Sequence, residues 1–142
     1  NYQTQPRGRG TIELSPVALS NHPLNGVWFD PTRNGEGFTI QFFPHLQDRC
    51  VAYLYSYGPQ PPTGFGSNLI RTQRWYECNG LKQSDGKYHL DIFEAEGGKW
   101  MDFDKPEMKI VGNALLSVTG AGLEISYSLP LGGMSSTLKR LL

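Results

Sequence analysis

The 142 residues have the length of a single domain, and 13 basic against 13 acidic residues leave no net charge. A chain without net positive charge lacks the basic surface that attracts nucleic acids and anionic membranes, so both kinds of partner are excluded. No run of about eighteen apolar residues occurs, which excludes a membrane-spanning helix.

The chain opens with a polar segment, residues 1–10, that we expect to be a flexible N-terminal arm. Residues 11–142 then form a single antiparallel β domain. A first strand is expected over residues 11–18, at a sheet edge because Pro16 cannot donate a ladder hydrogen bond.

The rest of the chain reads as short strands separated by Gly-rich and Pro-rich turns, without a capped helical period. These strands are predicted at residues 26–30, 37–43, 50–57, 72–79, 87–94, 108–111, 114–119, 123–129 and 135–141. The fold class is therefore all-β. An up-and-down antiparallel barrel of the lipocalin or avidin type is preferred, and a β-sandwich is the alternative.

Side-chain alternation predicts which face of two strands is buried. In residues 123–129, Leu and Ile alternate with Glu and Ser, as in a strand with one solvated face. In residues 50–57, Tyr53, Tyr55 and Tyr57 share one face. This tyrosine face either packs with its hydroxyls at a rim or lines a cavity.

The two cysteines are predicted to form a disulfide. If residues 50–57 and 72–79 make a hairpin, Cys50 stands opposite Cys78, at a separation that a disulfide can bridge. Two free, buried thiols are the alternative. A disulfide persists in an oxidising compartment, so this pairing predicts a secreted or periplasmic protein.

The segment GVWFDPTRNGEGF has a physical interpretation of its own. Pro31 ends a short strand, Asn34-Gly35 suits a tight turn, and Asp30 is expected to accept hydrogen bonds from the loop in an Asx-type turn. Alternatively, Asp30, Arg33 and Glu36 point from the loop into a functional site.

The same segment carries a resemblance to a known group of proteins. Its spacing G-x-W-x-[DN]-P-x-x-x-G-x-G, followed by Tyr55, Tyr57 and Trp75, resembles a motif of uncharacterised, exported bacterial β-domain proteins. The resemblance covers residues 26–141, but the loop PQPPTGFGSNLI is longer than the group's short turn. It implies export and a β domain, and it implies no activity.

No motif of a hydrolase, a metalloprotease or a phosphate-binding loop is present. His22, His45 and His89 are scattered, so no metal site is predicted. Asp102 and Asp104, with Glu107, either bind calcium or belong to a solvated loop, and the solvated loop is preferred because the spacing is not that of an EF-hand. No catalytic residue and no cofactor are predicted.

The aromatic residues then suggest a non-enzymatic binding module for a small apolar or sugar-like ligand. Its contacts are predicted to be Trp28, Tyr55, Tyr57 and Trp75, with Arg74 as the polar anchor.

Two alternatives stay open. A protein-interaction or inhibitor domain would act through the loop of residues 58–70, which contains Phe65. A glycoside hydrolase would pair two carboxylates, and the candidates are Asp30, Glu36, Asp91 and Glu94. A hollow barrel favours the small-ligand hypothesis, and a filled one favours the protein partner.

Overall fold

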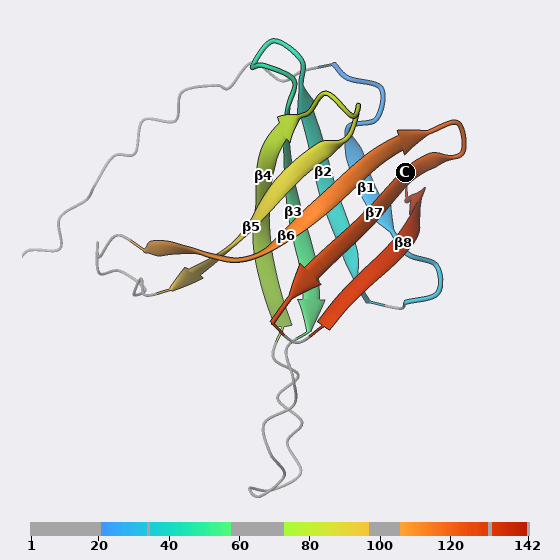
Figure 1. Ribbon diagram of the computed structural model, residues 1–142. Helices are drawn as coiled ribbons and strands as arrows, with labels where there is room; N and C mark the ends of the chain where they lie inside the picture. Colours follow the sequence, from blue (N-terminus) through green and yellow to red (C-terminus); the bar gives the residue numbers. More distant parts are fainter. Residues whose placement is uncertain (1–20, 34, 58–72, 97–105, 131, 142) are drawn as a thin grey trace, which may run out of the picture.

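Eight antiparallel strands close into a barrel in the computed structural model, which describes residues 21–33, 35–57, 73–96, 106–130 and 132–141 (Figure 1). The strands are β1 (Gly26–Phe29), β2 (Gly37–Phe43), β3 (Arg49–Tyr57), β4 (Gln73–Lys82), β5 (Tyr88–Glu96), β6 (Glu107–Thr119), β7 (Gly122–Leu129) and β8 (Gly132–Arg140). Each strand pairs with the next, and β1 pairs with β8. The predicted up-and-down barrel is confirmed, and the sandwich alternative was wrong.

Most strand predictions hold, with one clear difference. The two strands expected at residues 108–111 and 114–119 are one strand, β6, of 13 residues. Gly112 was read as a break, but the strand runs through it. The arm at residues 1–10 and the strand expected at residues 11–18 lie outside the described residues.

The barrel interior is filled by side chains. The inward positions of all eight strands carry mainly large apolar residues, and they pack into one cluster. Aromatic rings contact one another inside this cluster. The ring centroids of Phe42 and Tyr88 are 5.0 Å apart, and those of Phe38 and Tyr127 are 6.1 Å apart. Such packing stabilises the fold by burying apolar surface, and it leaves the inside without the ligand cavity of a hollow barrel.

The alternation expected in two strands is confirmed. Leu123, Ile125 and Tyr127 of β7 are buried, whereas the alternate residues Glu124 and Ser128 are exposed and Ser126 is partly exposed. In β3 the even-numbered residues point inward from Cys50 to Leu54, while the tyrosines at 53, 55 and 57 are exposed. The tyrosine face therefore lies on the outside of the barrel and lines no interior cavity.

The predicted Cys50–Cys78 disulfide is wrong, because β3 and β4 pair two residues away from the expected register. Cys50 is opposite Gly80, Cys78 is opposite Ala52, and both thiols are free and buried. A shift of two residues keeps every side chain on its own face, so alternation alone does not distinguish the two registers. The observed register lets the Lys82 amide donate to the Asp48 carbonyl at 3.0 Å.

The barrel has two different ends. At the upper end in Figure 1, short turns join β2 to β3, β4 to β5 and β6 to β7. At the lower end lie the loop from β1 to β2, the end of β3 and the start of β4. The described part of the chain includes no helix with the length and apolar character needed to cross a membrane.

Candidate functional site

Aromatic side chains gather on the outside of β3 and β4. Because alternate residues of a strand point to opposite faces, Tyr53, Tyr55 and Tyr57 all project outward. Trp75 of β4 is the direct partner of Tyr55, and their exposed fractions are 53% and 50%. The Tyr53 and Trp75 rings lie 6.2 Å apart and are tilted by 51°.

The same outer face continues onto β5 and β6. A row of register partners crosses the four neighbouring strands β3 to β6, and its members are Tyr53, Glu77, Phe93 and Ile110. Further along, Ala95 pairs with Met108. Met108 and Ile110 are exposed by 43% and 58%. We call the following set the outer apolar face: Tyr53, Tyr55, Tyr57, Trp75, Phe93, Met108 and Ile110.

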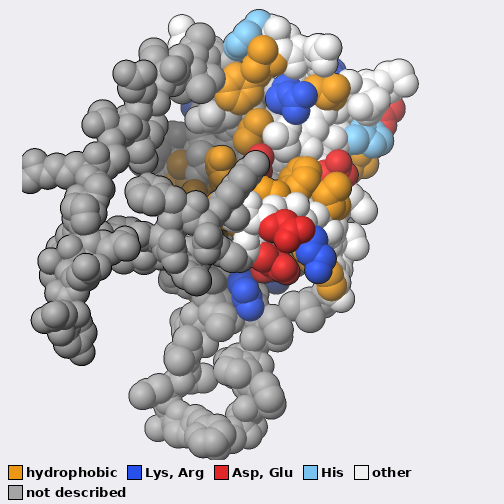
Figure 2. Space-filling view, turned by 90° about the vertical axis from the view of Figure 1, so that its left-hand side faces the viewer, with side chains coloured by type: hydrophobic (Ala, Val, Ile, Leu, Met, Phe, Trp, Pro, Cys, Tyr) orange, Lys and Arg blue, Asp and Glu red, His pale blue; other side chains and the backbone are white. Residues whose placement is uncertain are grey.

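Acidic groups lie within this face and behind it. Glu77 stands between Tyr53 and Phe93 in the register. Glu94, Glu96 and Glu107 point to the opposite side of β5 and β6. Burial, and next the charge of Glu77, raises the pKa of Tyr53, so its hydroxyl remains a hydrogen-bond donor. Figure 2, which looks from the left-hand side of Figure 1, shows exposed hydrophobic side chains beside acidic and basic ones.

The structure brings together three of the five predicted ligand-binding residues: Tyr55, Tyr57 and Trp75. Trp28 lies apart from them, inside the barrel and 5% exposed, and its indole nitrogen donates to the Leu24 carbonyl at 3.0 Å. Arg74 is the register partner of Ser56, which does not share the outward side of the tyrosines. Arg74 Nη1 lies 3.5 Å from Glu94 Oε1. Neither residue belongs to the outer apolar face.

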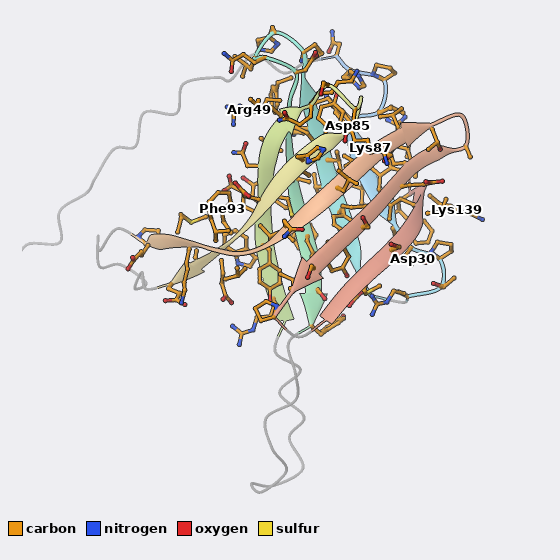
Figure 3. All side chains as sticks on the ribbon, in the orientation of Figure 1. Asp30, Arg49, Asp85, Lys87, Phe93 and Lys139 are labelled. Atoms are coloured by element: carbon orange, nitrogen blue, oxygen red, sulfur yellow. The ribbon has the colours of Figure 1, made fainter. Side chains whose placement is uncertain are left out.

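The Asp30 loop forms the predicted turn. The amide and the hydroxyl of Thr32 donate to Asp30 Oδ1 at 2.8 and 2.6 Å, which confirms the Asx-type interpretation. The Ser136 hydroxyl donates to the other carboxylate oxygen and ties the loop to β8. Figure 3 labels Asp30 beside β8. The bonds from Ser136 and then Thr32 lower the pKa of Asp30.

Arg33 and Glu36 of this loop meet each other. Their side chains approach to 3.1 Å, and the Ser56 hydroxyl donates to Glu36 at 2.8 Å. Asp30 and Glu36 do border one hollow, but its volume is about 10 Å³. That is room for about one water molecule, so this carboxylate pair leaves no space for a sugar ring.

A polar groove of about 880 Å³ lies on the outside of β5 to β8, and sequence reasoning did not identify it. Small side chains make it hollow: Ser126 is opposite Ser135, and Ser128 is opposite Gly133. His89, Asp91, Asn113 and Leu115 complete much of its lining. Its only signal in the sequence is serine at alternate positions, which also marks an ordinary solvated strand face.

The described residues contain no group of three or more His, Cys, Asp or Glu side chains that could hold a metal ion. His22 packs on Phe42 at 4.7 Å, and His89 pairs with Asp85 at 2.8 Å. Asp102 and Asp104 lie outside the described residues. Burial raises the pKa of both Cys50 and Cys78 to about 12, so neither thiol is a nucleophile at neutral pH.

No family model, curated protein or solved structure matches the chain. The geometry of the described residues is therefore the basis for the functional conclusion.

Proposed function

We propose that this domain is a non-enzymatic binding module that recognises a protein partner through the outer apolar face. The observation that carries the proposal is the half-exposed Tyr55–Trp75 pair on β3 and β4, together with exposed Ile110 and Met108 on β6, the second strand beyond β4. A group of large exposed apolar side chains on one side of a sheet is typical of an interaction site.

The character of the face favours a protein over a small ligand. Tyrosine, tryptophan and methionine are enriched in the buried centres of protein interfaces, and the first two dominate binding hot spots. A small apolar ligand needs a concave site that encloses it, and the barrel interior is filled. Ile110 adds an aliphatic side chain that a protein partner can cover.

The predicted interaction loop, residues 58–70, lies outside the described residues. It joins β3 to β4, the two strands that carry Tyr57 and Trp75. The interaction hypothesis therefore rests on the strands themselves, and a contribution from the loop stays a prediction.

The test starts from a phage-displayed library of random peptides selected on the wild-type domain. Trp75→Ala and Tyr55→Ala are each expected to weaken the selected peptides by about 30-fold, the cost of removing a hot-spot side chain. The matched control is Val118→Ala, because Val118 is 49% exposed at the other end of β6. Melting temperatures should change little in all three variants.

The proposal fails if no peptide is enriched, or if the selected peptides bind the Trp75→Ala and wild-type domains equally. Isothermal titration with the synthetic peptides gives the affinities. Weakening by Val118→Ala to the same extent would also contradict it, because the effect would then not belong to the outer apolar face.

The polar groove supports a second candidate, a sugar-like ligand. Hydroxyl and amide groups from Ser126, Ser128, Ser135 and Asn113 line it, and these groups hydrogen-bond to polyhydroxylated molecules. A glycan array tests this candidate: binding should be lost in Ser126→Tyr, which fills the groove, and kept in Trp75→Ala. The opposite pattern would place the sugar on the outer apolar face.

We also propose that the protein is secreted or periplasmic. The support is the resemblance of residues 26–141 to exported β-domain proteins, because the disulfide that first suggested export is not formed.

A further inference from the structure

The β5–β6 hairpin leaves the barrel as a two-stranded ribbon, residues 93–96 and 107–111. The pairing of β4 with β5 stops at Glu77 and Phe93. The pairing of β6 with β7 starts only at Asn113 and Ser128. Among the described residues, each ribbon strand therefore pairs on one side only, and Figure 1 shows the ribbon projecting away from the barrel.

The departure is built into the sequence at Gly112. The register shifts between Ile92 and Phe93, next to the position where Ile92 pairs with Gly112. A Cβ atom at Gly112 would lie 2.0 Å from the Ser128 carbonyl oxygen, so only glycine fits where β6 separates from β7. The free edge of β6 thus follows from a specific bend in the strand.

The ribbon is amphipathic. One side carries Phe93, Ala95, Met108 and Ile110, which belong to or adjoin the outer apolar face (Figure 3 labels Phe93 beside the barrel). The other side carries Glu94, Glu96, Glu107 and Lys109. Three carboxylates face one ammonium there, and Arg74 of β4 also pairs with Glu94, so this side keeps a small net negative charge.

We propose that the β6 edge at residues 107–111 takes up an extended segment of the protein partner as an added β-strand. This inference rests on the proposed function and names the partner's chemistry: alternating apolar and basic side chains. An exposed edge offers unpaired backbone N–H and C=O groups, which provide affinity in strand addition, while alternate side chains provide specificity.

The two faces of the ribbon specify that alternation. Apolar side chains of the added strand would extend the surface of Met108 and Ile110, which are already exposed. Basic side chains would lie on the other side, where the β6 edge carries Glu107 and Lys109 and β5 adds Glu94 and Glu96 behind them. Lys109 is only loosely engaged there, 3.9 Å from Glu96, so the carboxylates are not neutralised within the ribbon.

The probe is a fluorescein-labelled synthetic peptide of alternating lysine and valine, followed by fluorescence anisotropy with the whole domain. Two further versions carry backbone N-methyl groups, one on the lysines and one on the valines. Alternate N–H groups of a strand point to opposite sides, so one methylated version should bind at least about 10-fold more weakly and the other should bind normally.

The charge requirement has its own variants. Glu107→Lys should weaken the lysine peptide and strengthen a peptide of alternating glutamate and valine. Lys139→Glu is the matched control, because this exposed charge lies on β8 and should affect neither peptide. Equal binding of both peptides to wild type and Glu107→Lys would overturn the stated partner chemistry.

The outcomes separate this inference from the proposed function. If both methylated peptides bind normally while Trp75→Ala still weakens binding, strand addition is wrong and the outer apolar face stands. If one methylated peptide fails but Trp75→Ala has no effect, the β6 edge is the site and the aromatic residues of β3 and β4 do not take part. Concentration-dependent dimerisation of the peptide-free domain, lost in Ile110→Ser, would assign the edge to a second copy and overturn the inference.

Discussion

Cys50 and Cys78 show how burial controls the chemistry of single residues. Both thiols point into the barrel from neighbouring strands, and both cysteines are fully buried from solvent. Burial is the main cause that raises their pKa to about 12, and a protonated, enclosed thiol is unreactive. They act as small core residues.

The folded protein should therefore not react with Ellman's reagent at pH 8, and both thiols should react once denaturant unfolds the chain. The comparison of native and denatured absorbance measures this. A native mass that lacks the two thiol hydrogens would contradict the free thiols of the barrel.

Asp30 links the charge of one residue to the pH dependence of stability. Its pKa in the folded protein lies below its ordinary value of 3.8, chiefly because of the Ser136 hydrogen bond. The unfolded chain thus takes up the proton first as the pH falls. The stabilisation by Asp30 is complete above the unfolded pKa and is lost as the pH falls through the folded one.

Asp30→Asn should lower the melting temperature at pH 7, and the difference from wild type should shrink toward pH 3. Thermal denaturation followed by circular dichroism at both pH values checks this. A difference that stays constant would show that the Asp30 charge does not stabilise the loop.

At the scale of the strand, close backbone approach explains two glycines. A Cβ atom at Gly80 would lie 1.8 Å from the His89 carbonyl oxygen, so β4 and β5 approach too closely there for any side chain. Gly112 has the same role between β6 and β7. Glycines inside strands mark such sharp bends in barrels.

Gly80→Ala should destabilise the domain by about 3 kcal/mol, because the neighbouring strand has to move. Gly120→Ala is the control: a Cβ atom there meets nothing within 4 Å, and the change should stay within about 0.5 kcal/mol. Denaturant unfolding measures both. Equal stability of the two variants would argue against the tight approach of β4 and β5.

The strands were predictable because their signals are local. The flanking turn residues located β2 at residues 37–43 with its bounds unchanged, and alternation identified the buried side of β7. The register of β3 against β4 was not predictable, because a shift of two residues leaves each side chain on the same face of the sheet. The bend at Gly112 was misread as the end of a strand, because a glycine in the sequence can mark either a turn or a bend inside a strand.

The candidate site was predictable only in part, for the same reason. Tyr55 and Trp75 meet because both lie on outward positions of paired strands, and the sequence placed them in one set. Trp28 lies in β1 on an inward position, which a four-residue strand does not reveal by alternation. The ribbon depends on where pairing stops, and a glycine such as Gly112 does not reveal this from the sequence without the position of its neighbouring strand.

At the scale of the whole molecule, the barrel is a filled scaffold, and the proposed binding surfaces lie on its outside. Its seam is short: β1 and β8 pair only at Trp28 with Arg140 and Phe29 with Lys139, and the Leu141 amide donates to Val27. The Asp30–Ser136 hydrogen bond extends this closure beyond the paired residues. A closed, packed body fixes the positions of β3 and β4, which carry the aromatic residues of the outer apolar face.

The most direct test of this account is amide hydrogen exchange of the domain with and without a selected peptide. Binding on the outside predicts added protection in β4 and in the ribbon at residues 93–96 and 107–111, with β1 and β2 unchanged. Added protection of β1 and β2 without change in the ribbon would show that the ligand is bound elsewhere and would contradict the account.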